Sequence, residues 1–157
     1  MANKPSISDK PRKSRFKQGK FTPNNPSKYQ GTLPIVYRSS WELKYMKYLD
    51  MKSSVLFWAS ESLIIPYISP IDNKTHRYFV DFLVKMKLGD GSVATFTVEV
   101  KPLKETKPPR KSKNVMRFLQ EKQTYEVNQA KWTAATEFCK KRNVQFIVLT
   151  EKELNIT

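Results

Sequence analysis

Two runs of β-branched and aromatic residues, at positions 78–87 and 93–102, dominate the middle of the chain. They stand on either side of the turn Gly89-Asp90-Gly91. Strand-forming runs joined by a glycine-rich turn are typical of a β-hairpin. The pattern therefore predicts two neighbouring antiparallel strands here.

Before this hairpin, apolar positions recur with a helical period after Ser39. Ser39-x-x-Glu42 is typical of a capping box, which predicts a helix from Ser39 or Ser40 to about Met51. Its expected core face consists of Trp41, Tyr45, Tyr48 and Leu49. The runs at 55–58 and 63–67 predict two short strands, or one strand interrupted at 59–62.

After the hairpin, the pattern predicts two helical segments and a buried strand. The helices are expected at 115–126 and, with Asn128 as its cap, at 129–142; the strand is expected at 144–149. The apolar stripe of the second helix would consist of Trp132, Ala135, Phe138 and Cys139. A helix, strands, a helix and a strand in this order predict an α/β layer structure with an αβββαβ core.

Length and charge divide the chain into an arm and one folded domain. A chain of 157 residues suits a single core. Residues 1–33 have few apolar side chains, so we expect a flexible basic arm there and a domain at 34–157. The single cysteine permits no disulfide framework and favours a reducing compartment, and no apolar run is long enough to span a membrane.

The formal net charge of +15 is concentrated in two zones. Residues 1–38 contain nine Lys or Arg and one Asp, and residues 101–117 contain seven Lys or Arg and one Glu. Such zones are typical of proteins that bind nucleic acid phosphates, although a basic tail can also serve solubility alone. The residues expected to contact double-stranded DNA are Lys10, Arg12, Lys13, Arg15, Lys17, Lys20, Lys104, Lys107, Arg110, Lys111 and Lys113.

The hairpin carries the candidate chemistry. Asp81 is expected in its first strand and Glu99 in its second, and Lys101 shares a face with Glu99 because side chains in a strand repeat with a period of two. Two carboxylates, with the carbonyl of Val100, form an oxygen ligand set suited to Mg²⁺ or Mn²⁺. Lys101 would orient or deprotonate water or stabilise negative charge. The alternative is an exposed ion pair between Glu99 and Lys101, but both acids interrupt apolar strands, where an unpaired charge is unfavourable.

These residues resemble the PD-(D/E)xK nuclease superfamily, and specifically its TnsA-like branch. The resemblance rests on the segments 38–42, 78–82, 98–102 and 128–135. It departs from the motif in one place, because Val80 stands where the motif has proline. The resemblance implies a restriction-endonuclease-like fold and places Glu42 at the metal site with Asp81 and Glu99. From the residues alone, a helix-capping role is the commoner explanation of Glu42.

Within that branch, the chain is similar to the head-completion nucleases of tailed phages. This implies a metal-dependent DNA endonuclease or end-trimming nuclease, phage portal or neck proteins as partners, and a location in the host cytoplasm during assembly or in the virion. Gln123, Lys131 and His76 are possible accessory residues, or else surface side chains. The alternatives are a structural neck or portal-binding virion protein without catalysis, and a pure DNA-binding module, which leaves the two acids unexplained.

Overall fold

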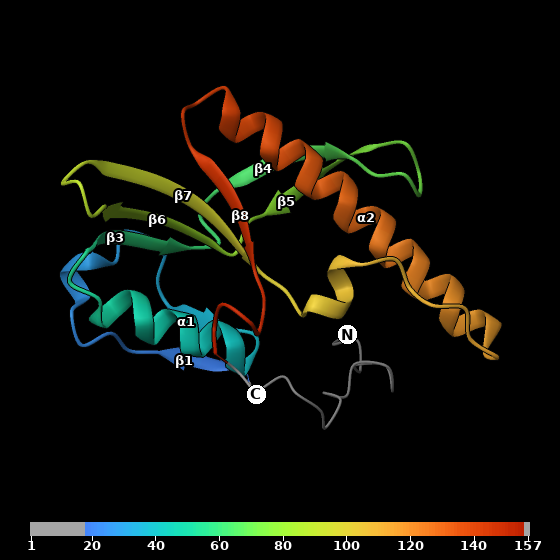
Figure 1. Ribbon diagram of the computed structural model, residues 1–157, viewed down its shortest axis with the longest axis horizontal. Coiled ribbons are helices and arrows are strands. Elements are labelled where there is room, and N and C mark those ends of the chain that lie inside the picture. The colour runs from blue at the N-terminus through green and yellow to red at the C-terminus, as the bar shows by residue number, and fades with distance from the viewer. Residues whose placement is uncertain (1–17, 156–157) are drawn as a thin grey trace, which may run out of the picture.

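A computed structural model describes residues 18–155. A four-stranded mixed sheet forms its centre, in the order β3-β6-β7-β8. β6 pairs antiparallel with β3 and β7, and β8 lies parallel to β7. These strands are β3 (Val55–Ser60), β6 (Phe82–Lys87), β7 (Val93–Val100) and β8 (Gln145–Leu149). The expected mixed α/β fold is confirmed (Figure 1).

Two helices flank this sheet, α1 (Ser40–Met51) and α2 (Val115–Lys140). Val98 of β7 belongs to the core that α1 covers, whereas the hydroxyl of the adjacent Thr97 lies 3.5 Å from the thiol of Cys139 on α2. Because neighbouring side chains in a strand point to opposite faces, the two helices cover opposite faces of the sheet. This arrangement is visible in Figure 1.

Helix α1 begins as the sequence predicts. The Ser39 hydroxyl accepts a hydrogen bond from the Glu42 backbone N–H at 3.1 Å, which caps the first turn. Tyr45 and Leu49 are buried against the sheet. Tyr48, expected in the core, is instead 46% exposed and stacks on Tyr45 with ring centroids 5.9 Å apart, because it lies at the edge of the helix face that the sheet covers.

Strands β4 (Ile64–Ile68) and β5 (Thr75–Phe79) form a separate two-stranded sheet that packs on α2. The chain then leaves this sheet and enters β6. The Val80 N–H donates to the Leu63 carbonyl, and the Asp81 carbonyl accepts from the Glu61 N–H. Asp81 therefore lies at the junction of β5 and β6, not inside a continuous strand as the sequence predicts.

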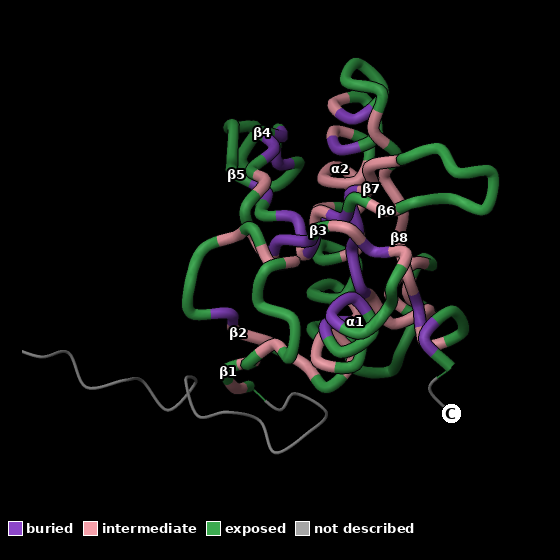
Figure 2. Tube along the Cα trace, turned by 90° about the vertical axis from the view of Figure 1, so that its left-hand side faces the viewer, coloured by how far each residue is buried: buried purple, intermediate pink, exposed green. Residues whose placement is uncertain are grey.

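The hairpin of β6 and β7 follows this junction, as predicted. Its register runs from Phe82 opposite Val98 to Lys87 opposite Val93. The turn between the strands is exposed (Figure 2), and Gly91 adopts a φ of 85°, which a residue without a Cβ tolerates.

The two helices predicted after the hairpin are one continuous helix, α2, of 26 residues. A short 3-10 turn, η3 (Leu103–Thr106), precedes it, and Asn114 caps it by accepting from the Arg117 N–H at 3.1 Å. Asn128 lies in its interior, and the prediction of a break there was wrong because neither Gly nor Pro interrupts the helix and its second half is held by packing. Among the described residues, no helix is long and apolar enough to cross a membrane.

The segment before α1 belongs to the folded domain from residue 18 onward. It contains β1 (Gly19–Phe21), which pairs with β2 (Ile35–Tyr37), and a 3-10 turn, η2 (Pro26–Lys28). The backbone N–H groups of Asn24 and Asn25 donate to the buried Asp50 carboxylate at 2.8 and 2.9 Å. The Lys28 ammonium donates to carbonyls at the C-terminal end of α1, which the helix dipole favours.

The expectation of a flexible arm through residue 33 is therefore wrong for residues 18–33. Sequence composition undervalued this segment because its anchors are backbone groups and one lysine, not apolar side chains. Residues 1–17, with the remainder of the expected arm, lie outside the described part of the chain.

Candidate active site

The C-terminal end of β7 lies beside the junction between β5 and β6. This places Asp81 close to Glu99. The Asp81 Oδ2 accepts a hydrogen bond from the Val100 N–H at 2.8 Å. Glu99, the preceding residue of β7, is only 5% exposed. Both carboxylates are therefore held next to the last residue of the central strand.

Both oxygens of Glu99 have partners. The Tyr78 hydroxyl donates to Oε2 at 2.5 Å, and the Lys101 ammonium lies 3.3 Å from Oε1. The Glu99 side chain is 7% exposed and that of Lys101 is 24% exposed, so the interpretation as an exposed surface ion pair is wrong. An ion pair that is largely buried and has an additional hydrogen-bond donor is held in one geometry, whereas a solvated ion pair is mobile.

Glu42 reaches the same region from the first turn of α1. Its Oε2 accepts a hydrogen bond from the Arg38 N–H at 2.9 Å. A capping box would use the Ser39 N–H, so Glu42 stabilises the helix start through the residue before the expected donor. Burial raises the pKa of Glu42, and the negative charges of Glu61 and Glu99 add to the increase, while the Arg38 N–H and guanidinium oppose it. Glu42 thus supports the helix start, and its charge also interacts with that of Glu99. Its expected role at the metal site stays a prediction.

Asp81 is repelled by the other two acids. Burial raises the pKa of Asp81 well above its usual range, and the neighbouring charges of Glu99 and Glu42 raise it further. The Val100 N–H and the Lys101 ammonium oppose this shift without cancelling it. The site therefore favours either a proton or another cation at Asp81.

This repulsion predicts how stability depends on pH when no divalent metal is present. The pKa of Asp81 is higher in the folded state than in the unfolded state, where it is near 3.8. The protonated carboxyl therefore stabilises the folded state, and this stabilisation is complete at pH values below the unfolded-state pKa. It is lost as pH rises through the folded-state pKa. Urea unfolding in a chelating buffer from acid to neutral pH should show wild type losing stability relative to Asp81→Asn, and parallel curves would contradict the repulsion.

Lys101 and Lys131 approach the acids from two elements. Burial lowers the pKa of Lys101, but the carboxylates of Glu99 and Asp81 outweigh burial, so its pKa lies above the usual value. Lys131 of α2 lies over the rings of Tyr67 and Tyr78, at 5.7 and 5.5 Å from their centroids. Its pKa is lowered, chiefly by burial and also by the Lys101 charge, against the attraction of the acids.

The other two accessory candidates lie farther out. Gln123 is exposed and lines a groove that also includes Lys131. His76 lies near the β4–β5 turn, where its Nε2 is 2.8 Å from the Asp72 carboxylate and its ring lies beside Tyr67. Neither contact is to an acid of the site.

The donor set fits a divalent cation held partly by the main chain. No three His, Cys, Asp or Glu side chains within residues 18–155 converge closely enough to hold a metal ion without other ligands. The Lys101 N–H donates to the Leu149 carbonyl of β8. Because backbone groups of successive strand residues point to opposite sides, the N–H and carbonyl of Val100 point away from β8, toward Asp81. Two carboxylates, one main-chain carbonyl and water are the ligands that Mg²⁺ accepts, and the cation would relieve the repulsion at Asp81.

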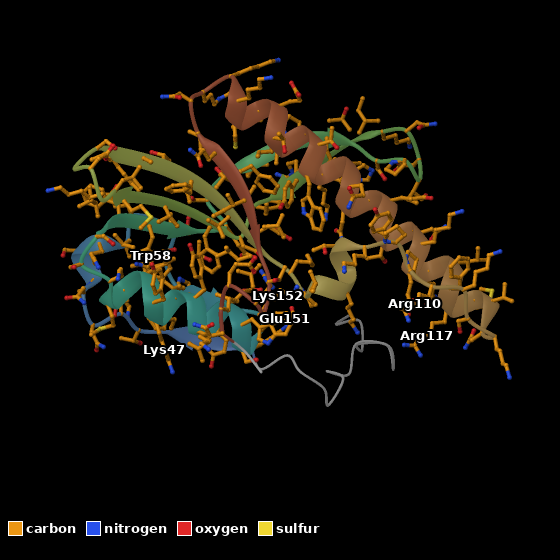
Figure 3. The ribbon with its side chains drawn as sticks, viewed as in Figure 1. Lys47, Trp58, Arg110, Arg117, Glu151 and Lys152 are labelled. Atoms are coloured by element: carbon orange, nitrogen blue, oxygen red, sulfur yellow. The ribbon has the colours of Figure 1, made fainter. Side chains whose placement is uncertain are left out.

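A basic loop begins at this site. The exposed cations between β7 and α2 are Lys104, Lys107, Arg110, Lys111 and Lys113, and Lys20 is exposed on β1. Arg110 and Arg117 lie at the N-terminal end of α2 (Figure 3). The remaining expected DNA-binding residues, Lys10, Arg12, Lys13, Arg15 and Lys17, lie outside the described residues.

Sequence reasoning missed three contributors to the site. Tyr78 holds Glu99, and Arg38 pairs with Glu61 through Nε and Nη2 at 2.8 and 3.2 Å, next to Glu42. Tyr78 and Arg38 both stand in the segments that carry the family resemblance, which was the signal available. Glu61 adopts a φ of 50° between β3 and β4, and only the fold reveals it.

Residues 52–151, which include β3, Asp81, Glu99, Lys101 and all of α2, match the family model described as TnsA-like endonuclease N terminal. This chain belongs to that family. A relative from Enterobacteria phage T4, named Head completion nuclease, is 40% identical to it. That alignment covers 87% of this chain and 92% of the T4 protein.

Proposed function

We propose that this chain is a metal-dependent deoxyribonuclease that cuts or trims DNA during completion of phage heads. The observation that carries the proposal is the group of Asp81, Glu99 and Glu42, in which Glu99 is buried and paired to Lys101 at 3.3 Å. Carboxylates repel a phosphate group, so a group of acids is unfavourable in a basic protein that binds DNA. A cation that lies between the carboxylates and the phosphate removes this repulsion. The family match and the name of the T4 relative support the same reaction class.

Each residue has a role in this proposal. Asp81, Glu99 and the Val100 carbonyl would hold Mg²⁺ or Mn²⁺, with Glu42 as a further carboxylate of the site. The cation, when bound, polarises the phosphodiester and its attacking water. Tyr78 fixes Glu99 through its hydroxyl, and Lys101 stabilises negative charge on the reacting phosphate.

DNA binding would come from the two basic zones. The cations at 104–113 are exposed beside the site, and residues 1–17 contribute further positive charge. Contacts of this kind bind phosphates without reading sequence. Phage portal or neck proteins are the proposed partners, and the host cytoplasm during assembly, or the virion, is the proposed location.

The direct test is incubation of purified protein with supercoiled and linear plasmid in Mg²⁺, in Mn²⁺ and in chelator. Cleavage with either metal and none with chelator is the expected result. Thermal unfolding supplies a second measurement, because a metal that binds only the folded state raises the melting temperature. A protein with neither cleavage nor metal-induced stabilisation would be the non-catalytic virion component.

Substitution of Glu42 separates its two roles. Glu42→Gln keeps an oxygen that can accept from the Arg38 N–H but removes the charge at the site. We expect an unchanged or slightly higher melting temperature without metal and a loss of cleavage of about tenfold or more, as for groups that tune a metal site. Full activity in Glu42→Gln would restrict this residue to the helix start.

A further inference from the structure

An open groove of about 470 Å³ runs along α2 beside the candidate active site. The α2 side chains that line it are Gln120, Gln123, Thr124, Val127, Asn128 and Lys131, and Ile71 of the β4–β5 turn faces them. These positions repeat every three or four residues and so share one face of the helix. The lining has amides, a hydroxyl and an ammonium but no carboxylate, which suits a polar or anionic ligand.

Asn128 is the most informative residue of this groove. It is only 7% exposed and lies in the interior of α2. Its carboxamide forms no hydrogen bond with any group in residues 18–155. Its polar atoms are not among the enclosed unpartnered ones of the described residues, so the amide opens into the groove, and because asparagine is a weak helix former, helix formation alone does not explain it. Because the side chain lines the groove, a bound ligand can complete its hydrogen bonds.

The groove is continuous with the candidate active site through Lys131. The ammonium of Lys131 lies over the ring of Tyr78, and the Tyr78 hydroxyl donates to Glu99. Lys131 follows Asn128 by three residues, so both side chains lie on the same side of α2. A ligand that reaches from the acids into the groove would therefore meet the ammonium first and the amide second.

We infer that this groove binds one unpaired nucleotide of the substrate strand, next to the phosphodiester at the acids. The inference rests on the proposed nuclease function. A hollow of about 470 Å³ has room for one nucleotide turned out of its stack. Lys131 would bind its phosphate, and the amides of Asn128 and Gln123 would bind the edge of its base, as Asn and Gln do in nucleic acid recognition. The preferred substrate is then DNA with a single-stranded or frayed end, because an unpaired base enters at the lowest cost.

The test compares binding of two DNA probes by fluorescence anisotropy in Ca²⁺, a metal chosen to support binding without cleavage. One probe is a blunt duplex, and the other is the same duplex with an overhang of a few nucleotides. Wild type should prefer the overhang by about tenfold, the range that a good bidentate amide contact provides. Asn128→Leu should lose this preference, with unchanged binding of the blunt duplex and an equal or higher melting temperature.

Gln129→Leu is the matched control, since it removes the neighbouring amide, which does not line the groove. It should keep the preference. Gln123→Leu, at an exposed position of the groove, should reduce it without involving the core, so the test stands even if Asn128→Leu does not fold. No preference in wild type, or an intact preference in both groove variants, would overturn the inference.

The two proposals fail in different ways. An overhang preference that depends on Asn128, in a protein that cuts no DNA in any metal, would retain the groove and refute the nuclease. Metal-dependent cleavage with equal affinity for the two probes would retain the nuclease and refute the groove.

Discussion

Asp81→Asn and Glu99→Gln are each expected to reduce metal-dependent DNA cleavage by at least about a hundredfold, since even groups that only support metal ligands contribute ten- to a hundredfold. The same substitutions remove one of the charges that repel each other in the metal-free site. We therefore expect an unchanged or higher melting temperature of Asp81→Asn in chelator, whereas Glu99→Gln also loses the ion pair with Lys101 and should melt at a lower temperature. DNA binding in chelator should be equal or tighter, because a negative charge near the phosphates is gone.

Divalent metal distinguishes these variants from the wild type. Mg²⁺ or Mn²⁺ should raise the melting temperature of the wild type and leave that of the acid variants nearly constant. Glu121→Gln is a suitable control, because Glu121 forms an exposed ion pair with Arg117 at 2.9 Å on α2, away from the acids. If Asp81→Asn lowers stability and both acid variants retain cleavage, the acids are structural and the proposed function is wrong.

The strand and helix pattern was sufficient for most of the fold. A run of β-branched and aromatic residues located β7, and a near-continuous apolar run located β8. The serine before Glu42 located the start of α1, because local hydrogen bonding determines a helix cap. The junction at Asp81 was missed. It depends on backbone hydrogen bonds to Glu61 and Leu63, which are long-range pairings that leave no mark in the sequence around Asp81.

The acidic residues of the candidate site could be predicted from the sequence, but the side chains that hold them in place could not. Asp81, Glu99 and Lys101 could be identified because charged residues within apolar strands are unusual. The Tyr78 hydroxyl could not be assigned to Glu99, because a tyrosine in an aromatic-rich strand looks like an ordinary core residue. Asn128 was misread for a related reason: asparagine is common at helix caps, so the pattern favoured a helix boundary over a groove residue.

Lys101 offers the second large effect, and its two possible roles predict different results. A base must lose its proton, whereas a residue that stabilises charge must keep it. Glu99 and Asp81 raise the pKa of Lys101 despite its burial, which favours the charged form. We therefore expect Lys101 to stabilise negative charge on the phosphate, and not to deprotonate water.

Lys101→Met should consequently reduce cleavage by at least about a hundredfold, the range measured when one group that stabilises transition-state charge is removed. It should still be stabilised by Mn²⁺, because an ammonium is not a metal ligand. Lys101→Arg keeps the charge but cannot act as a base at neutral pH, so it should retain a measurable fraction of activity, about a tenth, with the loss due to altered geometry. Single-turnover cleavage by the two variants decides the question: equal inactivity of Lys101→Arg and Lys101→Met would assign Lys101 as the base.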